Sequence, residues 1–493
     1  MPDADRKICF AASECVPFAK TGGLADVCGS LPKALADDGC EVKLFMPLYK
    51  KIRLFDYGFE KVNSLSDVPV KLGNINVSFS VWKGKLPVSD VEVNLIDCPR
   101  YFHRETVYTG DHDEDERFIL FQLAILETLQ RFKWAPDIIH CNDWQTALIP
   151  VFLKTTYSWD KLFENSKTLL SIHNIGYQGA FSSASVGKAN LSYSDYYQGG
   201  PLEFNGGFSF LKAGILHADV ITTVSPTYAK EIQTSEYGAG LEGVLSARSN
   251  KLFGILNGID TKTWDPAVDS YIRYNYNEDT LEFKLKNKVD LFKRIDRNFS
   301  PDILTIGIVS RLTTQKGFEL LEPILPKLME SDIQFVLLGS GEDNYEKFFE
   351  RVNYTFPEKF LTYIGYENEL SHLITAGCDA MLMPSRYEPC GLNQMYALKY
   401  GTVPIVRKTG GLADTVLDND EFSGTGNGFT FEIFSSEALL DAIGRAYELY
   451  KDKNEWDKVM RRGMREDFSW NRSAIKYIEI YSNLMSEAVS HAG

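Results

Sequence analysis

The chain carries one heptapeptide twice, as Lys20-Thr21-Gly22-Gly23-Leu24-Ala25-Asp26 and, with the same seven letters, at positions 408–414. Each copy follows an apolar, strand-like run and precedes a helical pattern, which indicates two similar half-molecules. Paired glycines let backbone N–H groups come close to an anion, and the helix after them adds unpaired N–H groups and the positive end of its dipole. The repeat therefore predicts strand-to-helix turns that fit a diphosphate.

Such a glycine pair also has a purely structural interpretation, because glycine adopts positive φ angles at no steric cost. The lysine before each pair favours phosphate binding, since an ammonium ion beside a helix N-terminus is a common phosphate clamp. Lys20 is the stronger candidate. Lys408, with Arg407 beside it, is equally compatible with an inherited structural turn.

Short β-rich runs alternate with helical patterns along the chain. The predicted strands are residues 8–12, 42–46, 137–141, 168–172, 220–224 and 253–256, followed by a second series at 304–309, 335–338, 361–364, 380–383 and 403–406. Helical patterns lie among them, for example at residues 118–132 and 437–450. This alternation predicts an α/β fold with two doubly wound domains in tandem, whose ligands bind beyond the carboxyl ends of the strands.

The segment 264–300 loses this rhythm and becomes charged and irregular, so we expect the domain boundary there. The predicted division is an N-terminal Rossmann-like domain, residues 1–262, and a C-terminal Rossmann-like domain, residues 263–470. A last helical stretch, residues 471–488, has no strand after it and is expected to pack on one of the two domains.

Composition excludes several classes of partner. A length of 493 residues suits two large α/β domains, and the formal net charge of -15 argues against nucleic acid and anionic membranes. Residues 1–7 are polar and no run of about 18 apolar residues occurs, which predicts an intracellular protein without a membrane span. The cysteines and histidines show no metal-ligand spacing, so we expect buried, reduced thiols and no metal site.

Two basic residues, Arg311 and Lys316, follow the predicted strand 304–309. Because they flank one strand-to-helix turn, both can point at a diphosphate and neutralise the charge that builds up on a leaving group, in place of a metal ion. Taken singly, either residue is also compatible with a basic, solvated turn. The further anion-ready loops favour the functional interpretation.

The loop after the predicted strand 380–383 combines a carboxylate, Glu388, with a Pro-Cys-Gly turn before a predicted helix. The N-terminus of that helix suits phosphate. A carboxylate beside a phosphate is costly unless it binds sugar hydroxyls or a developing cation. Glu388 is therefore a candidate for those tasks, with helix capping as the structural alternative.

Polar side chains also follow strands of the first series. His173 and Asp143 each come just after a predicted strand, so both are expected at the mouth of the cleft with groups suited to hydroxyls. His140 lies within an apolar strand and ranks below His173. Asn257 opens an Asn-Gly turn, for which an ordinary turn and a binding loop are equally compatible interpretations.

Together these motifs resemble one family, the bacterial glycogen synthases and plant starch synthases. The resemblance spans nearly the whole chain in the family's order. It rests on the heptapeptide at 20–26 and on His173-Asn174-Ile175-Gly176-Tyr177-Gln178-Gly179, Asn257-Gly258-Ile259-Asp260, Ser310-Arg311-Leu312 with Gln315-Lys316-Gly317, and Glu388-Pro389-Cys390-Gly391-Leu392. Each motif alone is modest evidence, whereas the set is specific.

The resemblance implies a GT-B glycosyltransferase, with two Rossmann-like doubly wound domains facing a deep inter-domain cleft. It implies transfer of glucose from ADP-glucose to the non-reducing end of an α-1,4-glucan, glycogen or starch, with retention of the anomeric configuration and no metal or other cofactor. A bacterial member is expected in the cytoplasm, and a processed plant-type chain in the plastid stroma. The helix at 471–488 is expected to cross back to the first domain.

The resemblance also assigns roles to individual residues. Arg311 and Lys316 are expected to hold the diphosphate and stabilise the departing nucleotide. Glucose is expected to contact His173 and Asp143, and Glu388 to bind its hydroxyls or support the cationic transition state. The other expected substrate-binding residues are Lys20, Gly22 and Gly23 from the opposite domain, Asn257, Tyr366 near the nucleoside base, and the backbone of Cys390, Gly391 and Leu392.

Two positions depart from related patterns. Many related glycosyltransferases place a second acid eight residues after the first, where this chain has Tyr396, which removes a candidate nucleophile and favours a front-face mechanism without a covalent intermediate. Asn393 stands where the family commonly has Thr, which puts the local phosphate contacts in question. Tyr101 and Phe102 are expected near the acceptor, with core packing as the alternative for their rings.

Three rival functions stay open. One is another retaining GT-B enzyme with a different nucleotide sugar or a small acceptor, such as a sucrose-type synthase. A phosphorylase is the second, and it needs covalently bound pyridoxal phosphate. The third is a catalytically silent glucan-binding or regulatory homologue, which has no chemical reason to keep Lys20, His173, Arg311, Lys316 and Glu388.

Overall fold

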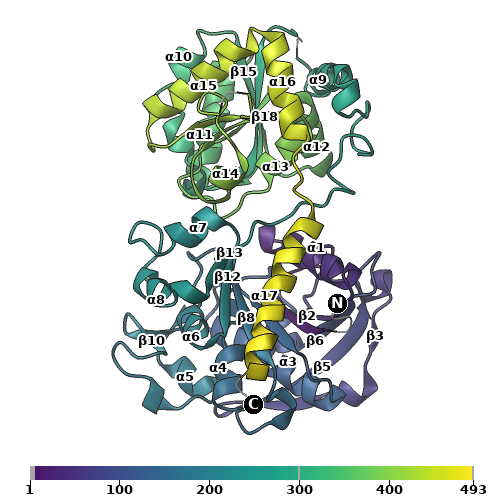
Figure 1. Ribbon diagram of the computed structural model, residues 1–493, viewed down its shortest axis with the longest axis vertical. Helices are drawn as coiled ribbons and strands as arrows, with labels where there is room; N and C mark the ends of the chain where they lie inside the picture. The colour runs from purple at the N-terminus through teal and green to yellow at the C-terminus, as the bar shows by residue number, and fades with distance from the viewer. Residues whose placement is uncertain (1–5, 298–299, 423, 491–493) are drawn as a thin grey trace. The chain divides into compact units, whose positions relative to one another are not determined.

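The computed structural model describes residues 6–297, 300–422 and 424–490. The chain forms two compact units, the first comprising Met1–Val224, Ala229–Gly258 and Trp470–Gly493, and the second comprising Ser225–Tyr228 and Ile259–Ser469. Each unit is built around a mainly parallel sheet flanked by helices (Figure 1). This confirms the predicted α/β class.

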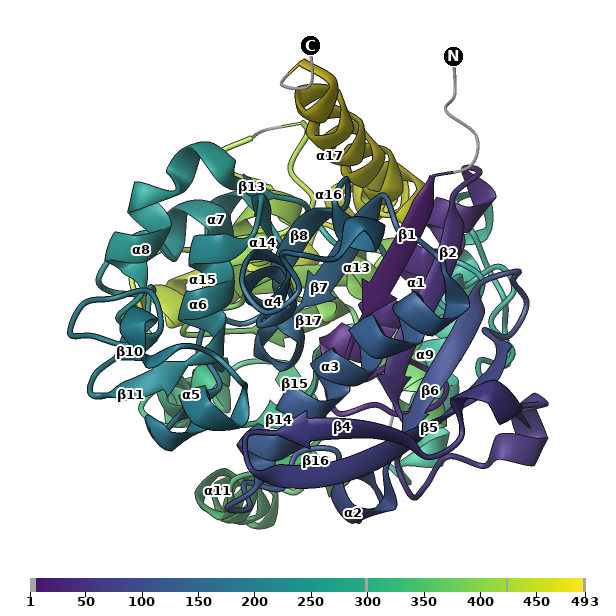
Figure 2. The same ribbon diagram turned by 90° about the horizontal axis from the view of Figure 1, so that it is seen from below.

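The main sheet of the first unit has the strand order β13-β12-β8-β7-β1-β2-β6-β5-β3, with β4 paired to β5. Its parallel part consists of β1 (Lys7–Ala11), β2 (Glu41–Pro47), β6 (Glu92–Asp97), β7 (Ile138–Asn142), β8 (Lys167–Ile172), β12 (Val220–Thr223) and β13 (Leu252–Gly254). All of these except β6 were predicted. In Figure 2 the purple strands β1 and β2 run side by side.

The sequence pattern does not reveal the antiparallel edge of this sheet. The long strand β5 pairs with three others, and side chains near both of its ends alternate between half-buried and exposed. It therefore lacks the continuous apolar run that marks a buried parallel strand. The unpredicted strands of the first unit are β3 (Glu60–Lys61), β4 (Val68–Leu72), β5 (Ile75–Lys85), β6, and a separate small sheet of β9 (Ala180–Phe181), β10 (Glu203–Phe204) and β11 (Gly207–Ser209).

Three long helices belong to the first unit: α1 (Gly23–Asp37), α3 (Glu114–Phe132) and α17 (Trp470–Ser490). The helical patterns at 118–132 and 471–488 are confirmed. α17, yellow in Figure 1, packs against α1, and its Tyr481 hydroxyl lies 2.7 Å from Nδ1 of His140 in β7. Shorter helices in the first half of the chain are α2 (Pro99–Phe102), α4 (Ile149–Lys154), α5 (Ala184–Lys188), α6 (Phe210–His217), α7 (Pro226–Glu231) and α8 (Glu242–Ala247).

The second unit contains a parallel sheet with the order β16-β15-β14-β17-β18-β19. Its strands are β14 (Leu304–Leu312), β15 (Ile333–Gly341), β16 (Phe360–Ile364), β17 (Ala380–Met383), β18 (Val403–Arg407) and the unpredicted β19 (Phe429–Phe431). Its helices are α9 (Glu282–Arg294), α10 (Leu325–Leu328), α11 (Asp343–Thr355), α12 (Asn368–Gly377), α13 (Asn393–Lys399), α14 (Gly410–Thr415), α15 (Ser436–Tyr450) and α16 (Lys453–Met464).

Apolar side chains cover both faces of this second sheet. Along β15, Phe335 and Leu337 join one buried cluster, whereas Val336 and Leu338 join another. Successive side chains of a strand point to opposite faces, so a strand with helices on both sides buries nearly every position and is mostly apolar, with a few buried polar residues such as Gln334. This is why the second series of strands was readable as continuous apolar runs.

The expectation of an irregular segment at 264–300 is wrong in part, because α9 lies within it. Its charged residues are not all solvated: Lys284 is buried and its Nζ donates to the Ala376 carbonyl at 2.8 Å. Lys288 Nζ lies 2.6 Å from the Asp379 carboxylate. Burial lowers the pKa of Lys284 to about 7. The sequence did not reveal this helix because charged residues that are paired inside the unit look like residues of a solvated loop.

Three expectations from composition concern the whole chain. All eight cysteines are buried, as predicted. Within the described ranges no group of three or more His, Cys, Asp or Glu side chains is arranged to hold a metal ion. No described helix has both the length and the apolar character needed to cross a bilayer.

Candidate active site

The first glycine loop lies at the start of α1. Gly22 is the N-cap residue and α1 begins at Gly23, so the predicted strand-to-helix turn is confirmed. Lys20 is exposed, and its Nζ lies 2.7 Å from Oδ1 of Asp26 in the first turn of the helix. This ion pair holds the ammonium group beside the helix N-terminus, where a phosphate would also be stabilised.

An unpredicted carboxylate, Glu14, also occupies this loop. Its Oε2 accepts hydrogen bonds from the backbone N–H groups of Thr21 and of Gly22, the latter at 3.2 Å. Glu14 is only 3% exposed, and burial raises the pKa of its carboxyl although these hydrogen bonds oppose the rise. Two N–H groups that the sequence pattern assigned to an anionic ligand are thus engaged by the protein itself. The sole signal for Glu14 in the sequence is its position just beyond a predicted strand.

Asp143 and His173 meet at the carboxyl ends of two adjacent strands. Asn142 ends β7 and pairs in register with Ser171 of β8. Oδ1 of Asp143 accepts the backbone N–H of His173 at 2.7 Å, and the His173 Nε2 lies 2.9 Å from Oδ1 of Asn142. The structure therefore brings these two predicted residues together.

The protonation of His173 follows from its neighbours. The Asn142 side chain donates its Nδ2 to the Ala11 carbonyl at 3.0 Å, so its Oδ1 must accept, and His173 Nε2 carries the proton. Burial lowers the pKa of His173 to about 3. The imidazole is therefore neutral, with Nδ1 as its hydrogen-bond acceptor.

The backbone of Asp143 adopts a conformation that is normally reserved for glycine, with φ 56° and ψ −173°. The side chain is only 8% exposed, and burial raises the pKa of its carboxyl to about 7, despite N–H groups donated by His173 and Asn174. Strain of this kind persists only where surrounding contacts enforce it, and it is concentrated at functional sites. Asp143 is thus unusual both in its positive φ angle and in the raised pKa of its carboxyl.

Two other predicted positions of the first unit have different surroundings. His140 is fully buried between Tyr481 and Ser171, each 2.7 Å from one ring nitrogen, which fits a structural role. Asn257 is 6% exposed, and among the described residues its Oδ1 has no hydrogen-bond partner. The next residue, Gly258, is pressed against Trp470, since a Cβ there would lie 2.6 Å from the Trp470 nitrogen. The Asn-Gly turn therefore combines close packing with one unsatisfied polar atom.

In the second unit, Arg311 is not in the predicted loop. β14 continues to Leu312, and Arg311 pairs in register with Ser340 of β15, so it is an exposed strand residue. Backbone pairing with β15 extends the strand three residues past its apolar run, which a pattern of apolar residues cannot show. Lys316 ends the 3-10 turn Thr314–Lys316 that follows.

Lys316 and Glu388 are brought together by the fold. Their Nζ and Oε2 atoms lie 2.6 Å apart, and Ser385 Oγ donates to the same oxygen at 2.9 Å. Helix capping does not explain Glu388, because α13 begins at Asn393 with Leu392 as its N-cap and no side-chain cap. The carboxylate is instead held by a lysine and a hydroxyl, as a largely buried charge requires.

The second glycine loop packs against the turn that carries Glu388. The Gly411 N–H donates to the Glu388 carbonyl at 3.1 Å, and a Cβ on Gly410 would lie 1.9 Å from that oxygen. Lys408 pairs with Glu421 at 3.3 Å and Glu432 at 3.1 Å. This copy of the heptapeptide therefore supports the neighbouring turn.

The remaining candidates of the second unit line the same turn or lie apart from it. Gly391 has a φ of 73°, and Gln394 Nε2 donates to the carbonyls of Cys390 and Gly391 at 3.0 Å each. Asn393 Nδ2 donates to the Val309 carbonyl at the end of the apolar part of β14. Tyr366 is 75% exposed, as a ring that receives a nucleoside base would be.

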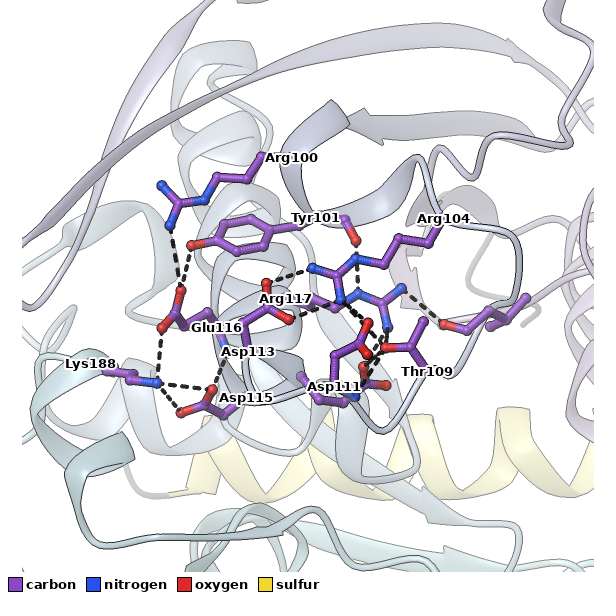
Figure 3. Close-up of polar contacts among 12 residues, drawn as sticks. Arg100, Tyr101, Arg104, Thr109, Asp111, Asp113, Asp115, Glu116, Arg117 and Lys188 are labelled. Carbon is purple, nitrogen blue, oxygen red and sulfur yellow. Dashed lines mark hydrogen bonds and ion pairs between the residues drawn. The ribbon is translucent and has the colours of Figure 1, made fainter.

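Tyr101 and Phe102 are not placed for contact with an acceptor. Both are fully buried, and the Tyr101 hydroxyl donates to Oε2 of Glu116 at 2.8 Å (Figure 3). The packing alternative for these rings is thus the correct one, because their apolar area is consumed by the core of the first unit.

Family models match both halves of the chain. Residues 7–247 match the starch synthase catalytic domain, and residues 291–462 match the glycosyl transferases group 1 model. A glycogen synthase of Moorella thermoacetica is 46% identical over 98% of this chain and 97% of its own length. A glycogen synthase of Thermotoga maritima is 45% identical over 98% and 99%, respectively.

Solved structures support the same assignment. The catalytic domain of starch synthase IV from Arabidopsis thaliana, bound to ADP and acarbose, superposes with a TM-score of 0.91 at 34% identity, covering 98% of this chain and 100% of the other. A sucrose-phosphate synthase from Thermosynechococcus elongatus, at 17% identity and a TM-score of 0.61, shares the fold. The predicted GT-B fold is confirmed. The chain belongs to the family of the glycogen synthases and starch synthases.

Proposed function

We propose that this protein transfers glucose from ADP-glucose to the non-reducing end of an α-1,4-glucan, with retention of the anomeric configuration. The observation that carries the proposal is the full-length match to glycogen synthases, in a chain whose fold pairs Lys316 with Glu388. A related starch synthase has been solved with ADP and acarbose, which supports a nucleotide donor and a glucan acceptor for this chain.

On the donor side, Lys316 and Arg311 hold the diphosphate and stabilise the departing nucleotide. Lys316 is suited to this because the Glu388 carboxylate, rather than water, holds its ammonium group in place before the donor binds. When a diphosphate arrives, Lys316 shares its charge between the two anions. Glu388 then contacts the glucose hydroxyls or the developing oxocarbenium charge.

On the sugar side, His173 and Asp143 contact the glucose. The neutral imidazole accepts a hydroxyl hydrogen through Nδ1, since Nε2 is committed to Asn142. Asp143 adds a carboxyl whose pKa of about 7 places both protonation states within reach near neutral pH.

Retention proceeds at the front face without a glycosyl-enzyme intermediate. The position where related enzymes carry a second acid is Tyr396, whose ring stacks on Trp264 with centroids 4.0 Å apart. A phenol held in an aromatic stack is no substitute for a nucleophilic carboxylate. The other proposed substrate contacts are Lys20 with Gly22 and Gly23, Asn257, Tyr366 at the base, and the Cys390, Gly391 and Leu392 backbone.

The test is glucose transfer to a glycogen primer from ADP-glucose and, in parallel, from UDP-glucose, following nucleotide release without added metal. Primer-dependent ADP release supports the proposal. Dominant UDP release would keep the reaction and overturn the donor. Transfer to fructose in place of glycogen would favour a sucrose-type synthase, and no transfer from either donor would favour a silent homologue.

A further inference from the structure

The loop at residues 103–113 of the first unit is held by two arginines (Figure 3). Arg104 contacts Asp111 at 2.6 Å and Asp113 at 2.5 Å. Arg117, in α3, donates from Nη2 to the Val107 carbonyl at 3.0 Å. The loop is therefore clamped from within and from the helix that follows it.

Arg117 is an unusual anchor because its side chain is fully buried. Its Nε donates to the Tyr101 carbonyl at 2.8 Å, and its Nη1 lies 2.6 Å from Oε2 of Glu114. A buried guanidinium is tolerated only when its charge is paired and its donors are used, and here each nitrogen has a partner. Arg117 therefore fixes the backbone just before the loop, at Tyr101, and near the middle of the loop, at Val107.

The residue after Val107 is Tyr108, and the clamped loop directs its hydroxyl at two groups. That oxygen lies 2.8 Å from Ser13 Oγ and 3.0 Å from Oε1 of Glu14. An ionised carboxylate only accepts, so Tyr108 donates to Glu14 and Ser13 donates to Tyr108. A short chain of hydrogen bonds thus ends on the carboxylate that binds the glycine loop.

From these contacts we infer that Tyr108 and Glu14 are positioning residues of the glycine loop at 20–26, with the arginine-clamped loop at 103–113 as their support. Glu14 Oε1 is held by Tyr108, while Oε2 holds the N–H groups of Thr21 and Gly22. The loop that carries Lys20 is thereby preorganised before a donor binds. The inference rests on the proposed function for its effect on turnover, but the contacts themselves do not.

Removal of the Tyr108 hydroxyl should also change the pKa of Glu14. Burial raises the pKa of Glu14 and the Tyr108 hydrogen bond opposes it, so Tyr108→Phe raises that pKa further. The acidic limb of transfer then shifts to higher pH, because protonation removes the negative charge of Glu14 and weakens the hydrogen bonds that both N–H groups donate to it. The titratable groups that act on Glu14 or feel its charge are Asp26 of α1, Asp143 after β7, Tyr49, Tyr108, Cys15 and Cys28.

The experiment compares Tyr108→Phe with Tyr49→Phe, which loses a buried hydroxyl bonded to the Ser13 carbonyl at 2.7 Å but not to Glu14. Hydrogen exchange of the peptide covering residues 20–26 should be faster in Tyr108→Phe only. The KM for ADP-glucose should rise roughly tenfold with kcat little changed, as for a lost hydrogen bond to a charged group. In a Glu14→Gln background, Tyr108→Phe should no longer move the acidic limb.

Unchanged exchange at residues 20–26 in Tyr108→Phe, or an equal change in Tyr49→Phe, would overturn the inference. Exchange needs no turnover, so it decides the positioning role even if the unaltered protein transfers no glucose. Absence of glucose transfer by the unaltered protein would contradict only the proposed function.

Discussion

Lys316 Nζ lies 2.6 Å from Glu388 Oε2, which joins the turn after β14 to the turn before α13. Seventy-two positions separate the two residues in the chain. Both side chains are largely buried, and Ser385 shares the same carboxylate oxygen.

Lys316→Ala is expected to reduce kcat by roughly 10²–10³-fold, because it removes charge stabilisation from the leaving nucleotide. Glucan binding, measured separately by affinity electrophoresis on glycogen, should change little. Lys408→Ala is the matched control, since that lysine is paired with Glu421 and Glu432 and should retain most activity. Equal losses of turnover and glucan binding in Lys316→Ala would contradict the role.

The two glycine pairs should respond differently to alanine. Among the described residues, and apart from its chain neighbours and its own helix backbone, no atom lies within 4 Å of a Cβ built on Gly23, whereas a Cβ on Gly411 would lie 2.1 Å from the Cys390 carbonyl. Gly411→Ala should lower the free energy of unfolding by about 1–3 kcal/mol, as overpacking does. Gly23→Ala should stay within about 0.5 kcal/mol of the parent. Denaturant unfolding of both variants checks this, and similar losses would show that the copies are structurally equivalent.

Asp143 should make stability fall as pH rises. Its folded pKa of about 7 is above the ordinary 3.8, so between these values the folded protein keeps a proton that the unfolded chain releases. Asp143→Asn cannot ionise, so its free energy of unfolding relative to the parent should increase through this window, by at most about 1.4 kcal/mol per pH unit.

The control for that series is Asp219→Asn, because hydrogen bonds and Lys154 lower the pKa of Asp219 in spite of burial. Its stabilisation is present above the ordinary pKa and lost as pH falls through the folded one, so the sign is opposite. Melting curves from pH 4 to pH 8 lie above the Asp219 window, so Asp219→Asn should show almost no slope relative to the parent where Asp143→Asn rises, and equal slopes in both variants would expose a common, non-specific trend.

His173 should remain neutral throughout the working range. Burial holds its pKa at about 3, so its imidazole C–H resonances should not titrate between about pH 5 and 8. Proton NMR, with His173→Ala to assign the signal, measures this. An inflection within the range would mean that the imidazole is protonated there and donates from both nitrogens.

Local patterns sufficed for much of the fold. Most positions of the buried parallel strands are apolar, and all eleven predicted strands are present. The antiparallel strand β5 was not predicted, because its exposed residues lie on one face at its start and on the opposite face at its end, which leaves neither a continuous apolar run nor a single alternation. The helix α9 was not predicted because Lys284 and Lys288, which look like solvated residues in the sequence, are paired inside the unit.

Candidate residues followed the same division. A polar residue just beyond an apolar strand is visible in a sequence, which singled out Asp143 and His173 and led to the contact between them. Glu14 stands in a similar position in the sequence. Its positioning role, however, depends on hydrogen bonds with Thr21, Gly22 and Tyr108, which come together only in the folded chain.

By itself the sequence determined the alternation of strands and helices, the turn at the start of α1, and the family. Tertiary structure decided how the two identical heptapeptides differ. Lys20 lies beside a glycine pair with open space around it, whereas Lys408 is paired with two glutamates and its glycines pack against the turn that carries Glu388. The reason is physical. Backbone conformation responds to near neighbours in the chain, but burial, charge pairing and hydrogen-bond partners come from residues that are distant in sequence and are set only when the sheets assemble.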